Sequence, residues 1–191
     1  MNYKQYFVEN KIDNIESFFE YSKNCFHYGW MDQNNKFHEG VNDGKTYCLQ
    51  SPEELITSKT GICWDKTELY RYWFSLMTQY NYETYYIFYD DNIGCPSHSI
   101  FVFYNDNFVF WFEPMFNDDT FNYSGIHQYS NILELLKDVK RVFIKNAVLK
   151  NTIPKSYDNS KIYLYKYEQP KFHINGYEMR NHIDNSQLIK L

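Results

Sequence analysis

The sequence is poor in glycine, proline and cysteine, and each shortage excludes a class of structure. Its 191 residues include 7 glycines and 5 prolines, and no Pro/Gly/Ser-rich linker, charge block or internal repeat divides them. We therefore expect a single domain over residues 1–191. The four cysteines lack the paired CxxC spacing of a zinc site, so we predict no metal and no cofactor.

Long apolar runs and runs of Lys or Arg are also missing. No window reaches the roughly 18 apolar residues of a membrane span, and the start, MNYKQYFVENK, lacks the apolar core of a secretory signal. A net charge of −5 without a basic run gives little support to a nucleic-acid or membrane partner. We expect a cytoplasmic protein with reduced cysteines. The composition leaves the oligomeric state open.

Aromatic residues are abundant, and their positions indicate where helices form. They make up 21% of the chain, which predicts a thick aromatic core or an aromatic-lined cleft. A first helix follows Asp13, which we expect to cap it. Ser51, Pro52 and Glu54 open a second helix. A third runs from about Cys63 to Gln79, and its periodic apolar residues are predicted core: Leu69, Tyr72, Trp73, Leu76 and Tyr80.

Strand patterns follow these helices. The predicted strands are Tyr82–Tyr89, His98–Tyr104, Asn107–Glu113 and Ile162–Tyr167. A long loop is expected over Met115–Tyr129, and then a helix from about Asn131 to Val148 capped by Ser130. Helices followed by neighbouring strands predict an α+β fold with an antiparallel sheet.

Cys63 is the candidate nucleophile, in the stretch SKTGICWDKTELYRYWF. It begins a predicted helix, where the positive end of the helix dipole stabilises a thiolate. Cys25 shares a helix face with Phe18 and Phe26 and is expected to be a small buried hydrophobic residue. Cys48 and Cys95 have no helix start beneath them.

His98 is the candidate base, because it opens a strand directly after a loop. If HSIFVFY and NFVFWFE pair across a two-residue loop, Asn105-Asp106, Glu113 lies directly opposite His98. The carboxylate would then orient the imidazole. A three-residue loop without a bulge would instead place Glu113 on the other face, and Asp118 or Asp119 is an alternative carboxylate.

Both faces of this hairpin are apolar along most of their length. Such a pattern is typical of strands in the middle of a sheet, covered on both sides. We expect the helix that begins at Cys63 to cover the face that carries His98.

Three fragments together resemble the transglutaminase-like fold of papain-related cysteine enzymes: SPEELITSKTGICWDKTELYRYWF, YNYETYYIFYD and HSIFVFYNDNFVFWFEPMF. The resemblance covers Gln50–Phe116, about a third of the chain. That family has a Gly-x-Cys at a helix start, a histidine at the start of a following strand, and an acidic residue before proline on the next strand. Cys63, His98 and Glu113 match these places, although the family's acidic residue is usually aspartate.

The resemblance implies N-terminal helices, with the nucleophile at a helix start, packed on an antiparallel sheet. Papain-like peptidases share the Cys-Trp pair, but their histidine lies about 130–150 residues after the cysteine. That interval is far longer than the one from Cys63 to His98, so the peptidase subfamily is disfavoured. His173 with Asn175 stays a distant alternative pair.

The implied activity is acyl transfer from a protein or peptide amide through a thioester on Cys63, with His98 as acid and base and Glu113 stabilising the imidazolium. The Cys63 N–H is an expected oxyanion donor, with Gln50 as a second. Trp64 either walls the acyl site or simply packs. Neither the residues nor the resemblance fixes whether water or an amine is the acceptor.

Two further interpretations stay open. Asp65, in the first turn of the helix, is expected to be a favourable partner of the helix dipole rather than a catalyst. The alternative to an enzyme is a catalytically silent domain that uses an aromatic cleft to bind a peptide or a partner.

Overall fold

The computed structural model describes residues 2–40, 43–90, 95–116 and 121–191. The chain divides into two compact units, one of Met1–Tyr80 with Gln169–Asn181, the other of Asn81–Glu168 with His182–Leu191. Within the described residues there are six α-helices and a six-stranded antiparallel sheet, which confirms the α+β class. None of the described helices has both the length and the apolarity to cross a bilayer. That the chain is one domain stays a prediction.

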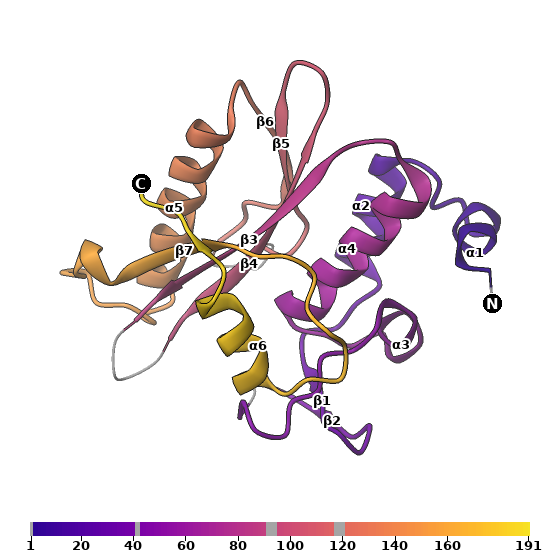
Figure 1. Ribbon diagram of the computed structural model, residues 1–191, viewed down its shortest axis with the longest axis horizontal. Coiled ribbons are helices and arrows are strands. Elements are labelled where there is room, and N and C mark those ends of the chain that lie inside the picture. The colour runs from indigo at the N-terminus through magenta and orange to yellow at the C-terminus, as the bar shows by residue number, and fades with distance from the viewer. Residues whose placement is uncertain (1, 41–42, 91–94, 117–120) are drawn as a thin grey trace. The chain divides into compact units, whose positions relative to one another are not determined.

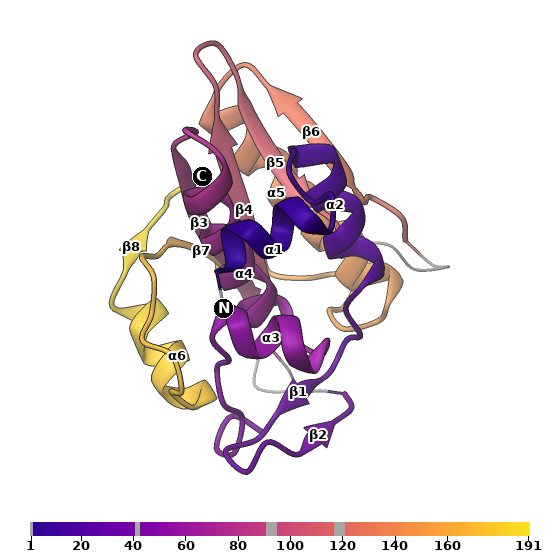
Figure 2. The same cartoon turned by 90° about the vertical axis from the view of Figure 1, so that its right-hand side faces the viewer.

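The first unit is built mainly from helices and can be followed in Figure 2. Its elements are α1 (Tyr3–Glu9), α2 (Ile15–Asn24), β1 (Trp30–Met31), β2 (Phe37–His38), α3 (Pro52–Ser58), α4 (Cys63–Met77) and the first part of α6 (Gly176–Asp184). Helix α2 packs on α4 through aromatic side chains, since Phe18 stacks on Trp73 with 4.3 Å between ring centroids. The Trp73 indole also donates a hydrogen bond to the Ile12 carbonyl.

Helix starts follow the predicted capping chemistry with two changes of residue. Ser51 caps α3 and Glu54 returns the hydrogen bond, as predicted. The cap of α2 is Asn14 rather than Asp13, since the Asn14 side chain accepts from the Ser17 N–H. In the second unit, Asn131 rather than Ser130 caps α5 (Ile132–Leu149). In both cases the next polar residue along the chain takes the capping role.

The second unit contains the large sheet, whose strands run in the order β6-β5-β4-β3-β7-β8. They are β3 (Tyr82–Tyr89), β4 (Ser97–Tyr104), β5 (Val109–Glu113), β6 (Gly125–Tyr129), β7 (Ile162–Lys166) and β8 (Gln187–Leu188), with a short 3₁₀ helix, η1 (Asn159–Lys161), before β7. Four of the strands match predicted runs to within two residues. The central position of β4, buried on both faces, is as expected.

Helix α5 packs on one face of this sheet, against β5 and β6 (Figure 1). Ile100, Val102 and Trp111 contribute to this core from the sheet, and Leu135, Val139, Val142 and Phe143 from the helix. His98 shares this face by strand alternation. Within this unit the helix packed on the core is α5, and the expected placement of the Cys63 helix on the His98 face stays a prediction.

The β4–β5 hairpin differs in register from the prediction. Phe101 pairs with Phe112 and Tyr104 with Val109, so the two-residue loop is Asp106-Asn107 and Glu113 is not directly opposite His98. The observed pairing is thus shifted by two residues along one strand from the predicted pairing. Because side chains alternate with a period of two, His98 and Glu113 still share a face and become diagonal neighbours.

Several elements have no counterpart in the predictions. β6 lies inside the expected loop Met115–Tyr129, of which residues 117–120 are outside the described part of the chain. Helix α6 follows Asn175, which caps it, because Asn175 and Glu178 exchange side-chain to backbone hydrogen bonds. Tyr80, predicted to be core, is 42% exposed.

Trp111→Ala tests the core between the sheet and α5. The Trp111 side chain is fully buried in it, so truncation should lower the free energy of unfolding by about 3–5 kcal/mol. Phe108→Ala, on the same hairpin but 39% exposed, serves as the matched control and should cost far less. Urea unfolding measures both, and similar losses for the two variants would contradict this core.

Candidate active site

Cys63 is the first residue of α4, as predicted, and Ile62 is the residue that precedes the helix. The N–H groups of a helix's first turn have no acceptor within the helix. The Cys63 N–H therefore points away from the helix body with the positive end of the dipole behind it. Cys63 is 7% exposed.

Asp65, two residues into α4, organises the start of this helix. Its Oδ2 accepts a hydrogen bond from the Ile62 N–H at 3.0 Å. Its Oδ1 accepts from the Gln50 N–H and from the Tyr47 hydroxyl, both at 3.0 Å. The carboxylate is fully buried, so it acts as an internal clamp on three chain segments, and not merely as a partner of the helix dipole.

Burial of Asp65 has an electrostatic cost. Desolvation raises the pKa of Asp65 to about 6, although its hydrogen bonds to Gln50, Ile62 and Tyr47 favour the charged form. A carboxylate accepts three hydrogen bonds more readily than a neutral acid does. Protonation of Asp65 would thus loosen the connection between Gln50 and the helix start.

Gln50, the expected second oxyanion donor, is held by Ser58 and Thr60, at the connection between α3 and α4. Its Nε2 donates to the Thr60 carbonyl at 2.7 Å, and its Oε1 accepts from the Ser58 hydroxyl at 2.7 Å. A primary amide has two N–H donors, so the Thr60 bond uses one of them. Gln50 is buried, and its role as an oxyanion donor stays a prediction.

Gly61, the glycine of the Gly-x-Cys motif, is required by a close approach. A Cβ there would lie 2.7 Å from Leu55 Cδ1 and 2.9 Å from Asp65 Cβ. Both distances are shorter than carbon atoms tolerate, and both neighbours are buried. Only glycine lets the chain pass between α3 and the first turn of α4.

Gly61→Ala should therefore displace the first turn of α4. We expect a loss of about 1–3 kcal/mol in unfolding free energy, the usual cost of overpacking, together with slower alkylation of Cys63. Chemical denaturation and the alkylation rate of the folded variant measure the two effects. An alanine variant with unchanged stability and unchanged Cys63 reactivity would show that this approach is not tight in solution.

His98 and Glu113 meet as predicted, although in a shifted register. His98 Nε2 lies 2.6 Å from Glu113 Oε2. Neither side chain is open to water, since His98 is 6% exposed and Glu113 is fully buried. The bond fixes Nε2 on the carboxylate, so Nδ1 is the ring nitrogen that would exchange a proton with a thiol.

The turn after β5 holds this pair in place. Glu113 Oε1 accepts hydrogen bonds from the backbone N–H groups of Met115 and Phe116, at 2.8 and 3.1 Å. The Phe116 ring stacks on the His98 imidazole with 4.1 Å between centroids. Glu113 thus orients the imidazole from one side while Phe116 covers a ring face. The hairpin pattern and the Glu-Pro pair indicated the contact between His98 and Glu113, and the part played by Phe116 was missed.

Two other histidines also lie on carboxylates, and sequence reasoning missed both. His38 Nε2 is 2.9 Å from Asp32 Oδ2, and His173 Nε2 is 2.9 Å from Glu54 Oε2. Asp32 also holds the tight turn between β1 and β2 through two backbone N–H groups, and Glu54 caps α3. These two pairs have evident structural roles.

The remaining cysteines differ in access. Cys25 is exposed, so the expectation of a buried residue is wrong: α2 ends at Asn24, and Cys25 already lies beyond the helix face that carries Phe18. Cys95 is also exposed. Burial, and then the negative charges of Glu54, Asp65 and Asp32, raise the pKa of Cys48.

Other predicted residues are placed as follows. Trp64 is buried and packs at 5.6 Å, centroid to centroid, on the Tyr47 ring, and its place in an acyl site stays a prediction. Asp118 and Asp119 lie outside the described residues. Of the distant alternative pair, His173 contacts Glu54 and Asn175 caps α6.

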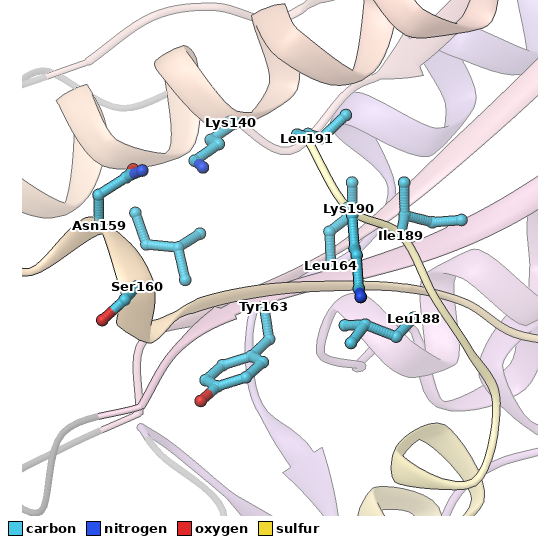
Figure 3. A pocket seen from close by; sticks show the side chains of 10 residues that line it. Lys140, Asn159, Ser160, Tyr163, Leu164, Leu188, Ile189, Lys190 and Leu191 are labelled. Carbon is cyan, nitrogen blue, oxygen red and sulfur yellow. The ribbon is translucent and has the colours of Figure 1, made fainter.

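The described residues of each unit form a surface hollow. The first, of about 400 Å³, is lined by His27, Tyr28, Phe37, Glu39 and Thr60. The second, of about 290 Å³, lies beside β7 and contains none of the predicted site residues. In Figure 3 Lys140 of α5 and Asn159 of η1 reach toward one another across it. Among the described residues, no cluster of His, Cys, Asp and Glu is arranged to hold a metal ion.

Glu68 is a buried carboxylate on α4. It is 1% exposed, and Arg71 Nε lies 3.3 Å from its Oε1. Burial raises the pKa of Glu68 to about 7, although the Arg71 charge opposes this. An acid whose pKa is higher in the folded protein stabilises the fold at low pH and loses that contribution as pH rises.

We therefore expect the unfolding free energy to fall between pH 4.5 and 7.5, by about 2 kcal/mol from Glu68 alone. Glu68→Gln should remove this part of the decline and make the protein more stable at pH 7.5, with little change at pH 4.5. Urea unfolding of both proteins at the two pH values measures it. Parallel pH profiles would contradict the assignment.

Comparison with protein-family models and with curated proteins finds no match to this chain. The site is thus described by its own geometry. His98 and Glu113 are brought together in the second unit, and Cys63, Asp65 and Gln50 are tied together in the first. That Cys63 meets His98 stays a prediction.

Proposed function

We propose that this protein is a transglutaminase-like enzyme that transfers an acyl group from a protein or peptide amide through a thioester on Cys63. The observation that carries the proposal is the 2.6 Å hydrogen bond between His98 and Glu113. A buried imidazole held by a buried carboxylate is the usual partner of a nucleophile that needs a base.

The first half of the reaction forms the thioester. The Cys63 thiolate attacks the amide carbonyl carbon, and the carbonyl oxygen becomes an oxyanion. His98 Nδ1 then gives its proton to the nitrogen of the leaving amine as the C–N bond breaks. The amine departs neutral, and the acyl group remains on the Cys63 sulfur.

The second half releases the acyl group. The acceptor, water or an amine, loses a proton to His98 Nδ1 as it attacks the thioester carbon, and the Cys63 sulfur leaves as thiolate. Glu113 stabilises the imidazolium in both halves through Nε2. Hydrolysis and amine transfer differ only in the acceptor.

Oxyanion stabilisation is assigned to the start of α4. The Cys63 N–H is a backbone donor at the positive end of a helix, and such groups are preorganised for developing negative charge. Gln50 is the second donor in this proposal. Asp65 holds Gln50 and Ile62 in fixed relation and therefore acts as a positioning residue. The reduced thiol that the chemistry needs fits the cytoplasmic location that we propose.

The pH dependence of Cys63 alkylation tests the proposal. If His98 stabilises the thiolate, His98→Ala should move the midpoint of the alkylation profile up by about one pH unit or more. Rates should be followed by peptide mapping between pH 5 and 9, because Cys25 and Cys95 are exposed and also react. Their profiles in the same samples are the internal control.

Glu113→Gln separates catalysis from simple reactivity. The glutamine variant should fold and keep a reactive Cys63, yet lose about a hundredfold or more in thioester turnover, because an amide stabilises imidazolium poorly.

The His98→Ala experiment also decides between the two proposed classes of protein. If the pH profiles of Cys63 alkylation in wild type and His98→Ala are superimposable, the enzyme is overturned and the silent binding module is favoured.

A further inference from the structure

The hollow lined by His27, Tyr28, Phe37, Glu39 and Thr60 adjoins the segment that leads into Cys63. Backbone hydrogen bonds join His27 to this segment. The His27 N–H donates to the Lys59 carbonyl at 2.8 Å, and the Gly61 N–H donates to the His27 carbonyl at 3.2 Å. The hollow is therefore anchored to the start of α4, within the first unit.

Two aromatic rings in this hollow are unusually open. Tyr28 is 63% exposed and Phe37 is 46% exposed. Phe37 is also fixed in place, since its ring lies against Gly29, where a Cβ would be only 2.5 Å from Phe37 Cε2. A chain that buries most of its aromatic side chains thus presents two of them together in one concavity.

The charges around the hollow favour a cation. Among the described residues, Glu39 is the only Asp, Glu, Lys or Arg that lines it. Both rings of the hollow are exposed, and so is Glu39. The Lys66 Nζ lies 5.9 Å from the centroid of the Tyr28 ring, so this ring already lies within reach of a positive charge. A cation bound in the hollow would thus meet two aromatic rings and a carboxylate.

We propose that this hollow is a substrate subsite that binds an arginine side chain of the polypeptide, next to the amide that Cys63 attacks. A planar guanidinium stacks on aromatic faces and directs its N–H groups at a carboxylate, which suits the Tyr28 and Phe37 rings and Glu39. A lysine side chain fits less well, because its compact charge is more strongly hydrated. The inference rests on the proposed function, since it assigns the specificity of that site.

Matched peptide probes test the subsite. Two dipeptidyl acyloxymethyl ketones, identical except that one carries arginine and the other its neutral isostere citrulline, should alkylate Cys63 at different rates. We expect the arginine probe to react about tenfold faster, with an advantage that shrinks at high salt. Glu39→Gln should reduce the preference to about threefold or less, and Phe37→Leu should reduce it as well.

Glu16→Gln is the matched control, because Glu16 is an exposed glutamate in the first turn of α2. It should keep the full preference. Iodoacetamide, which has no side chain to occupy the hollow, should alkylate Cys63 equally in wild type and Glu39→Gln. Equal rates for the two probes in wild type, or a preference unchanged in Glu39→Gln, would overturn the subsite.

A binding measurement separates the subsite from the chemistry. N-acetyl-arginine amide, titrated into the full chain, should shift the NMR signals of His27 and Phe37, and N-acetyl-citrulline amide should not. If arginine binds but Cys63 shows no thioester chemistry, the proposed function fails and the site stands. If Cys63 reacts without arginine binding or preference, the site fails alone.

Discussion

The buried carboxylate of Asp65 is the interaction on which the candidate nucleophile depends. It accepts hydrogen bonds from Tyr47, Gln50 and Ile62, and so joins the chain before α3 to the residue before Cys63. Its position also requires Gly61, because any larger residue would meet the Asp65 side chain. One carboxylate, whose own burial is unfavourable, thus holds Gln50 and the start of α4 in fixed relation.

Local chemistry made much of this structure predictable. A small polar residue such as Ser51 correctly predicted where a helix begins. The alternation of residues along β4 and β5 correctly predicted which side chains share a face of the sheet. The register of the hairpin was less accessible, because two loop positions give the same alternation and differ only in which residues pair. The diagonal His98–Glu113 contact survived this error because a glutamate side chain spans the offset.

Long-range contacts account for what the sequence did not reveal. β6 has weak alternation and becomes a strand through pairing with β5, and the polarity of α6 conceals a helix whose apolar residues are few. The clamp made by Asp65 depends on hydrogen bonds from Tyr47 and Gln50. Both residues lie well before Asp65 in the sequence, so no helix or strand periodicity links them to it. Cys25 shows the opposite failure, where a correct helix was extended two residues too far, to Phe26.

The turn from Glu113 to Phe116 has a consequence for the energetics of proton transfer. Two backbone N–H groups, one imidazole N–H and one aromatic ring fix the relative orientation of carboxylate and imidazole. The entropy of aligning them is therefore lost when the chain folds, and not when a ligand binds. A dipole array arranged in advance needs little reorganisation when the imidazole gains charge, so the protonated ring is accommodated without movement of its surroundings.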